Sequence, residues 1–534
     1  MYTLILFASC STGDGDVFPS EEVLVPPLEG PQWTSDVSLD PGDAGAPLSR
    51  IVVGHTDRES TLHIVIDDGG GEIDLTTLFP TVDHEFPLTG FQPAVPATVT
   101  VTPLADGVAG EALTFEVLAD GLPETWPRID VQERQIERVA PGWTLVGFGR
   151  AGDNTAEFAA MLDNYGAVRW IRESATDVID IRPAGQGLVS GVRLGEAFVW
   201  DIAGRVQNAW THTGNLTSTG IPLTDLGVHH DLVRKPDGTW LTLVLAQTDV
   251  EAYPVDYLSA QQRAPATIAD EHLVNFRDDG SVISEWSLSE RLDPERIGYG
   301  GLLDRFGLGM DWGHANAVSW NDERQEVVVS LRHQDAVVGL DGSSGDLTWI
   351  LANPDNWIDD LADKRLDGDF AWFFHQHAPV PVAGGILLFD NGNERASPFT
   401  ETDRVADAAN SSRVVRYDLD YEDRVAEEAW VFDTTILGKA FSNREGDANV
   451  LDNGNILTVW GSVGFIEGNP VSADNLGDYV VLLIEVTDSS PPETVWQLQL
   501  WTPPDVYANG WTANRAVRVA NPWDGIANLN GTLP

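Results

Sequence analysis

The stretch DWGHANAVSWNDERQEVVVSLR, from Asp311 to Arg332, contains a short polar-ended strand, a turn and an apolar strand that ends on a lone arginine. If the first strand is extended, its two-residue period places Trp312, His314 and Asn316 on one face. The predicted hairpin then brings Arg332 back towards them. We therefore expect an aromatic wall, an imidazole, an amide and a guanidinium to line one small volume.

Two other stretches also place a histidine just before a predicted hairpin. They are VHHDLVRKPDGTWLTLVL (228–245) and HQHAPVPVAGGILLFDNGN (375–393). In the second, His375 shares a strand face with His377 if the strand extends that far, and it is expected either to support His377 or to be exposed. Three such hairpins in one chain predict a repeated architecture.

Beyond about Thr125 the chain carries two elements that each occur six times. One is an acidic turn that leads to a tryptophan, and the other is a turn followed by an apolar strand. Two hairpins per repeat make a four-stranded antiparallel blade, so six units predict a six-bladed β-propeller. The repeat tryptophans are expected to pack in the outer strands: Trp170, Trp210, Trp286, Trp349, Trp430 and Trp496.

The region before these repeats has a different pattern. Short alternating runs such as RIVVGHT and ATVTVTPL are separated by Gly, Pro and Asp turns, which is typical of an immunoglobulin-like β-sandwich. The predicted fold is therefore all-β throughout. Residues 1–31 are expected to be a lipoprotein-like signal and tether, 32–124 a β-sandwich domain, and 125–534 a six-bladed catalytic propeller.

The composition excludes one large class of partner. The 534 residues include 83 acidic and 31 basic side chains, which gives a formal net charge of −52. Phosphate binding needs clusters of Lys and Arg, so nucleic acid is not expected as a partner. The acidity is interpreted as a highly solvated surface.

Cys10 is the one cysteine of the chain, so no disulfide within the chain is possible. It follows an apolar run and two small residues in MYTLILFASC, an arrangement that resembles a bacterial lipoprotein signal. We therefore expect export to the periplasm or cell surface, with membrane attachment through a lipid on Cys10. The alternative is an ordinary N-terminal segment with a chance cysteine.

The propeller geometry predicts where the histidines meet, because the first strand of each blade lines the axis. By the repeat pattern these strands begin at His230, His314 and His377 in three successive blades, and near Gly446 in the last. Strand alternation favours His230 over His229 as the residue that faces the channel. The alternative is a set of separately satisfied core histidines. The Asp-rich turns lack the ligand density of a metal site, so no metal is predicted.

These motifs, in their order along the chain, resemble the bacterial arylsulfate sulfotransferase family. The shared pattern is HHD before a PDG hairpin, DWxHxN with an arginine closing the next strand, QH before a hairpin that ends FDNGN, and GDA…DNGN. The resemblance covers roughly residues 125–520. It implies an enzyme that moves a sulfuryl group from a phenolic sulfate ester to a phenol acceptor, without a cofactor or a nucleotide sulfate donor.

The resemblance also implies roles for individual residues. His377 matches the histidine that becomes transiently sulfated; His314, Arg332 and His230 match catalytic residues around the sulfuryl group, and Asn316 matches a substrate-binding residue. A neutral imidazole is a competent nucleophile, and arginine can hold sulfuryl oxygens through paired donors. Asp231 and Asn316 are expected to fix imidazole tautomers.

Two other functions fit parts of the pattern. One is a non-catalytic propeller lipoprotein that binds a partner or a carbohydrate on one face, although such a module does not require clustered His and Arg. The other is a quinone-dependent dehydrogenase on a propeller, which needs a calcium site and a tryptophan-docked cofactor. The natural substrates and the oligomeric state cannot be predicted from the sequence.

Overall fold

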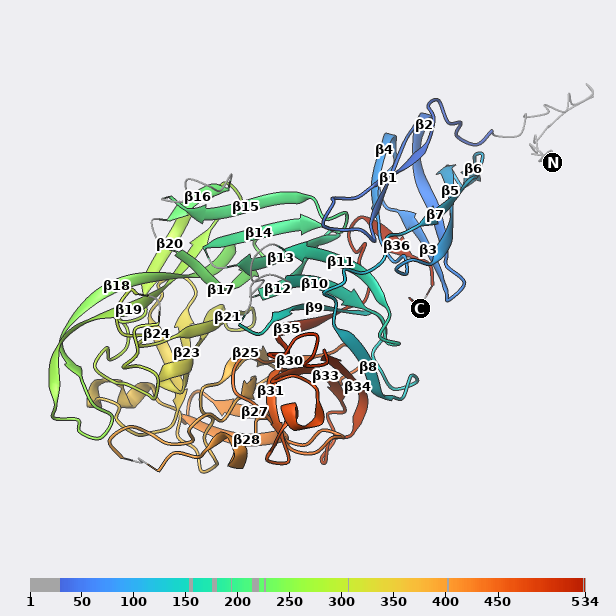
Figure 1. The fold of residues 1–534 in the computed structure, drawn as a ribbon. Helices are drawn as coiled ribbons and strands as arrows, with labels where there is room; N and C mark the ends of the chain where they lie inside the picture. Colours follow the sequence, from blue (N-terminus) through green and yellow to red (C-terminus); the bar gives the residue numbers. More distant parts are fainter. Residues whose placement is uncertain are drawn as a thin grey trace, which may run out of the picture.

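The computed structural model describes residues 29–533, apart from 153–156, 175–179, 194, 214–219, 225–226, 306, 401–402 and 532 (Figure 1). The all-β prediction is confirmed, since the described helices are short 3-10 segments between strands. None of the described helices is long and apolar enough to cross a membrane. Cys10 lies outside the described residues, so the lipid anchor stays a prediction.

An eight-stranded sheet forms the N-terminal part of the molecule. Its longest strand, β2, alternates buried and half-buried or exposed positions over most of its 18 residues, and it pairs with four neighbours. The last strand of the chain, β36, returns to pair with β3, and the immunoglobulin-like assignment of this sheet stays a prediction. The strands are β1 (Ser38–Pro41), β2 (Arg50–Asp67), β3 (Glu72–Thr77), β4 (Thr81–Leu88), β5 (Pro96–Ala105), β6 (Val108–Ala109), β7 (Leu113–Leu118) and β36 (Ala527–Leu529).

Five sheets of four or five strands follow and form a propeller-like ring (Figure 1). The first sheet takes one strand from near the end of the chain, and the next four sheets are built from consecutive strands. The first contains β9 (Trp143–Arg150), β10 (Glu157–Leu162), β11 (Val168–Ser174) and β35 (Trp511–Val519). The second contains β12 (Asp180–Gly185), β13 (Leu188–Arg193), β14 (Glu196–Asp201), β15 (Val206–His212) and β16 (Ile221–Thr224).

The remaining three of these sheets each hold four strands in sequence order. The third is β17 (Gly227–Arg234), β18 (Trp240–Pro254), β19 (Arg263–Phe276) and β20 (Val282–Ser287). The fourth is β21 (Ala315–Asn321), β22 (Glu326–Leu331), β23 (Ala336–Asp341) and β24 (Leu347–Ala352). The fifth is β25 (His377–Val382), β26 (Gly385–Asp390), β27 (Arg413–Asp420) and β28 (Val425–Phe432).

A seven-stranded sheet occupies the sector between the fifth sheet and the first. Its strand β30 contacts β25 on one side, and its strand β31 contacts β35 on the other. Its outer strand, β8, comes from the start of the ring-forming segment and pairs with β34. In the same way β35, from the end of that segment, pairs with β9 in the first sheet. Strands from the two ends of the segment are therefore hydrogen-bonded to each other in two sheets. The strands are β8 (Arg128–Arg134), β29 (Ala440–Ser442), β30 (Asp447–Val450), β31 (Ile456–Ile466), β32 (Asn469–Pro470), β33 (Val480–Val486) and β34 (Thr494–Trp501). The six-blade count stays a prediction.

The six repeat tryptophans lie on the strand farthest from the axis or next to it in their sheets, and all are buried. Trp170 Nε1 donates to the carbonyl oxygen of Ile202 at 2.8 Å, and Trp496 Nε1 donates to that of Asn164 at 3.1 Å. These two indoles therefore fill the gap to a neighbouring sheet while their polar atoms are satisfied. The predicted packing role of these tryptophans is confirmed.

The N-terminal sheet is attached to the ring through a buried arginine, Arg169 of β11. Its guanidinium bonds Asp68, which follows β2, at 2.6 Å and Asp163 at 2.8 Å, and it also donates to the carbonyl oxygen of Gly90 at 3.2 Å. All three charged side chains are at most 4 % exposed. Because a buried charge is costly without a partner, Arg169 couples the two parts of the molecule.

We predict that Arg169→Ala lowers the free energy of unfolding by about 3–5 kcal/mol, because it leaves two buried carboxylates without a cation. It should also separate the unfolding of the N-terminal sheet from that of the ring. Urea and thermal unfolding followed by tryptophan fluorescence measure both effects. The control is Arg138→Ala, which removes an exposed ion pair with Glu493 and should cost less than about 1 kcal/mol. Equal effects of the two substitutions would contradict the coupling.

Candidate active site

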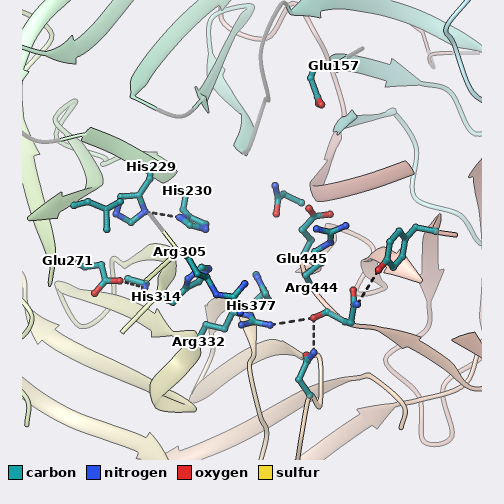
Figure 2. A pocket seen from close by; sticks show the side chains of 16 residues that line it. Glu157, His229, His230, Glu271, Arg305, His314, Arg332, His377, Arg444 and Glu445 are labelled. Carbon is teal, nitrogen blue, oxygen red and sulfur yellow. Dashed lines mark hydrogen bonds between the residues drawn. The ribbon is translucent and has the colours of Figure 1, made fainter. Parts of the chain in front are cut away.

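A cavity of about 640 Å³ opens among the inner strands of the ring (Figure 2). Four of the five residues singled out in the sequence line it: His230, His314, Arg332 and His377. Asn316 lies instead on a small neighbouring hollow that shares His230 and His377 with the cavity. The structure therefore brings residues from three separate hairpins to one place.

Both members of the HH pair line the cavity, so the prediction that only one faces it was wrong. His230 has a left-handed backbone, with φ of 56°, and the pairing of β17 with β18 shifts register between His229 and Leu232. This bulge breaks the strict alternation of side chains. His229 Nδ1 lies 2.7 Å from His230 Nδ1, so one ring donates and the other accepts.

The residue predicted to form an aromatic wall, Trp312, does not line the cavity. Trp312 is fully buried in the hydrophobic core, where its Nε1 donates to the carbonyl oxygen of Arg296 at 3.0 Å. Strand β21 begins only at Ala315, and His314 before it is left-handed with φ of 48°. Trp312 and His314 therefore point to different places, although they are two residues apart.

The hydrogen bonds of His377 determine its tautomer. The amide nitrogen of Asn391 donates to the carbonyl oxygens of Ser442 at 2.9 Å and Glu445 at 2.7 Å. Its Oδ1 must therefore accept from His377 Nδ1, at 2.7 Å. In a neutral ring this leaves Nε2 with a free lone pair, as a nucleophile requires. Asn391, within the FDNGN motif, was not assigned this role from the sequence.

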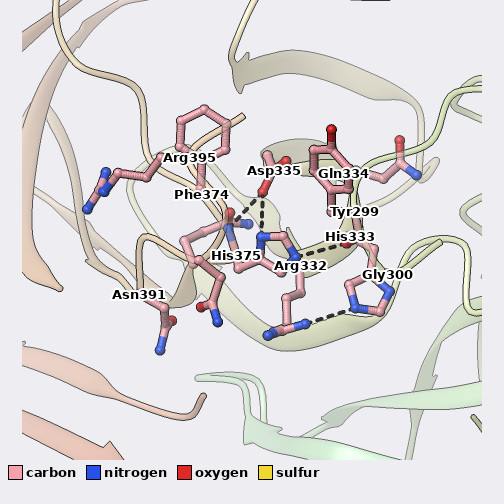
Figure 3. Close-up of polar contacts among 12 residues, drawn as sticks. Tyr299, Gly300, Arg332, His333, Gln334, Asp335, Phe374, His375, Asn391 and Arg395 are labelled. Atoms are coloured by element: carbon pink, nitrogen blue, oxygen red, sulfur yellow. Dashed lines mark hydrogen bonds and ion pairs between the residues drawn. The ribbon is translucent and has the colours of Figure 1, made fainter. Parts of the chain in front are cut away.

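Arg332 is positioned by His333, a residue that the sequence reasoning missed (Figure 3). Arg332 Nη1 donates to His333 Nε2 at 2.8 Å, while His333 Nδ1 donates to the carbonyl oxygen of Asp311 at 2.7 Å. This places the proton of the neutral ring on Nδ1 and makes Nε2 the acceptor. The sequence signal that could have indicated this contact is the Arg-His dipeptide at the end of a predicted strand.

His314 is held by Asp311, whose Oδ2 lies 2.8 Å from His314 Nδ1. The nearest ligand atoms of Asp311, His314 and His333 lie within 4.8 Å of one another, which is a spacing that could hold a metal ion. Both nitrogens of His333 are, however, engaged with Arg332 and a carbonyl group. These three residues therefore form a hydrogen-bonded support for the cavity wall.

Two predicted tautomer contacts are not formed. The Asp231 carboxylate pairs with Arg182 at 2.6 Å and accepts from the backbone N–H of Val318 at 2.9 Å, so it holds strands together and does not bond an imidazole. Asn316 Nδ2 donates to the carbonyl oxygen of Gln376 at 2.8 Å and so supports the backbone just before His377.

His375 is buried and supports the neighbourhood of His377 from outside the main cavity. Its Nε2 donates to the carbonyl oxygen of Tyr299 at 2.9 Å, and its backbone N–H donates to Asp335 at 2.7 Å (Figure 3). It lines a second hollow of about 310 Å³. This hollow shares Arg332 with the main cavity and has Tyr257 on its wall.

Burial keeps the cavity imidazoles neutral. It lowers the pKa of His229 to about 3, and with the nearby Arg332 it lowers the pKa of His377 well below the usual value. The pKa of His314 is also lowered, since burial outweighs its bond to Asp311. Burial lowers the pKa of Arg332 only to about 10, so the guanidinium stays charged at neutral pH. The cavity therefore places the charged guanidinium of Arg332 next to uncharged imidazole rings.

The molecule is therefore a propeller-like protein whose cavity combines a guanidinium with neutral imidazoles. Residues 130–499 match the model of the arylsulfotransferase (ASST) family. This match covers more than half of the chain, and the chain belongs to that family.

Curated relatives agree with this family. The chain is 23% identical over 342 residues to arylsulfate sulfotransferase AssT of Escherichia coli, covering 52% of this chain and 53% of that protein. It is 23% identical over 339 residues to the protein of the same name from Lelliottia amnigena, with the same coverage. The chain thus spans about half the length of the curated relatives it matches.

Among solved structures, a protein of unknown function from Bacteroides caccae is 12% identical and aligns with 70% of this chain and 100% of its own, at a TM-score of 0.38. This score is too low to establish a shared fold.

We predict that the protein loses stability as pH falls below about 6.5, because an unfolded histidine binds a proton there while the buried imidazoles do not. Each such imidazole contributes up to about 1.4 kcal/mol per pH unit to this slope. His229→Gln should therefore make the free energy of unfolding less dependent on pH between about 6.5 and 5, whatever its effect at pH 7.5. Urea unfolding at a series of pH values tests this, and an unchanged slope would contradict it.

Proposed function

We propose that the protein is an arylsulfate sulfotransferase that moves a sulfuryl group from a phenolic sulfate ester to a phenol through a sulfohistidine on His377, independently of a nucleotide donor. The observation that carries this proposal is the fixed tautomer of His377. Asn391 holds Nδ1–H, so the lone pair of Nε2 is available in the cavity that also contains Arg332.

In the first displacement, His377 Nε2 attacks the sulfur atom and the bond from sulfur to the aryl oxygen breaks. The phenolate leaves, and the sulfuryl group stays on the ring. Arg332 is suited to hold the sulfuryl oxygens, because a guanidinium presents paired donors in one plane and His333 fixes its direction.

In the second displacement, the oxygen of an acceptor phenol attacks the same sulfur, the sulfur–nitrogen bond breaks and the O–H proton of the phenol is released, which balances the phenolate formed in the first displacement. His377 returns to its neutral state, ready for another donor. The depressed pKa of His377 favours this cycle, since the ring is not blocked by a proton at neutral pH.

The aryl group needs apolar or aromatic walls. Tyr257 and Tyr299 provide such walls in the second hollow, with ring centroids 4.9 Å apart. The hydroxyl group of Tyr257 accepts from the backbone N–H groups of Gly300 and Leu302, at 3.0 and 3.2 Å, which fixes the ring. We assign this hollow, which meets the main cavity at Arg332, to the aryl ring.

Our proposal extends to the fold and the location of the protein. The seven-stranded sheet would serve as the sixth blade, which is supported by its contacts with sheets on both sides. The N-terminal sheet would be immunoglobulin-like. The motif before Cys10 supports export to the periplasm or cell surface with a lipid anchor.

We predict that the purified protein releases phenol from a chromogenic aryl sulfate at a rate that rises steeply with added acceptor phenol. His377→Ala should abolish both displacements, while His63→Ala in the N-terminal sheet should retain activity. Digestion of protein incubated with donor alone should give a peptide with one sulfuryl group on His377. Near-normal turnover by His377→Ala would exclude the covalent mechanism. Absence of turnover with a panel of donors would favour the alternative, a non-catalytic binding propeller.

We predict that Arg332→Lys lowers kcat/KM by about a hundredfold. A lysine keeps the charge but cannot offer two parallel donors, and the loss of one such contact in a dry site costs a few kcal/mol, or about 10²–10³ in rate. Steady-state kinetics with an aryl sulfate measures this. The control is Arg324→Lys in the turn between β21 and β22, which does not line the cavity and where the guanidinium pairs with Glu326. Equal activity of the two variants would contradict a paired grip by Arg332.

A further inference from the structure

Glu271 of β19 lies on the cavity wall beside His314 and takes no part in the two displacements proposed above (Figure 2). The residue is buried, with 1 % of its surface exposed. One oxygen, Oε1, accepts from the backbone N–H of Ala315 at 2.9 Å. The other oxygen, Oε2, is buried and has no hydrogen-bond partner among the described residues. A buried polar atom without a partner is rare and calls for a ligand or a proton.

Gly313 leaves the room that this carboxyl group occupies. A Cβ atom at position 313 would lie 2.6 Å from Glu271 Oε2, a distance that real Cβ atoms do not show. The glycine of the DWGHAN motif therefore accommodates the carboxyl group next to the strand that carries His314.

The surroundings of Glu271 disfavour its charged form. No Lys, Arg or His among the described residues lies within ion-pair distance of it, and an unpaired buried carboxylate is strongly disfavoured. The groups that face it are Asp311 before β21, Tyr253 of β18, and Asp270 on its own strand, with His314 and Arg305 on the same cavity wall. Burial and then Asp311 raise the pKa of Glu271 well above its usual value.

A proton at this place would assist the first displacement. A departing phenolate is a strong base, and it leaves more readily if an acid protonates its oxygen. The cavity imidazoles have lowered pKa values and so carry no spare proton at neutral pH. Of the two other carboxyl groups on the wall, that of Glu445 accepts from Ser462 Oγ at 3.1 Å, and Glu157 also has a partner.

We propose that Glu271 is the proton carrier of the site: a neutral carboxylic acid that gives its proton to the departing phenolate and whose carboxylate then takes the proton of the incoming phenol. This inference rests on the proposed sulfuryl transfer. In the first displacement the O–H bond of Glu271 breaks as the sulfur–oxygen bond breaks, and phenol leaves. In the second, the acceptor oxygen attacks sulfur while its proton returns to Glu271. Protons and charge balance over one cycle.

The test compares two donors, phenyl sulfate and para-nitrophenyl sulfate, with wild type and Glu271→Gln. The nitrophenolate is a weaker base and leaves without help. Glu271→Gln should therefore lower kcat/KM for phenyl sulfate by about 10²-fold or more, the usual contribution of a general acid. It should lower that for the nitro compound only a few-fold. The ratio of the two values does not depend on the fraction of folded protein.

A pH series adds a second readout. With phenyl sulfate the wild type should lose activity as pH rises through the pKa of Glu271, because the acid form disappears, and Glu271→Gln should lack this alkaline limb. The control is Glu326→Gln, at a buried glutamate that pairs with Arg324 away from the cavity. It should leave both the donor ratio and the pH profile unchanged.

Equal losses with both donors, full activity with both, or an alkaline limb that persists in Glu271→Gln would each overturn this role while leaving sulfuryl transfer intact. If the wild type turns over neither donor, the proposed function and this inference both fail. The two failures are therefore distinguishable.

Discussion

Arg515 of β35 holds the centre of the ring together. Its guanidinium bonds Asp180 of β12 at 2.6 Å, Asp447 of β30 at 3.1 Å and Asp231 of β17 at 3.4 Å. These carboxylates come from three different sheets, and all four side chains are at most 7 % exposed. Burial opposes the charge, but Asp447, Asp180 and Asp231 raise the pKa of Arg515. Removal of the arginine would leave buried carboxylates without sufficient compensation, so ring closure depends on it.

The network of Arg515 and the three aspartates also holds the strands that carry the site residues. Asp231 directly follows His230, at the bulge where β17 leaves its regular register. It also accepts from the backbone N–H of Val318 in the next sheet, at 2.9 Å. Arg515 and Asp180 lie on the small hollow that His230 and His377 share. The positions of the imidazoles therefore depend on the neighbouring buried ion pairs as well as on their own hydrogen bonds.

The sequence predicted the strand repeats, the packing of the tryptophans and the convergence of His230, His314 and His377, because these follow from hydrophobic period and ring topology. It did not predict the second histidine of the HH pair or the departure of Trp312. Both result from left-handed backbone at His230 and His314, which are not glycines and give no local signal. The contacts made by His333 and Asn391 depend on loops folded against the ring, and such contacts have no sequence period.

Burial of the cavity keeps its imidazoles unprotonated, and it also removes the protons that these rings could donate. In a chain with a formal net charge of −52, the sulfate ester that we propose as substrate would need a local cation, and Arg332 supplies one where the surrounding rings are uncharged. The burial that keeps His377 unprotonated, and hence nucleophilic, also deprives the neighbouring histidines of protons they could donate. The same burial has the opposite effect on a carboxyl group, which retains its proton. One low-dielectric cavity can therefore hold a nucleophile and an acid together at neutral pH, provided that the nucleophile is an imidazole and the acid is a carboxyl group.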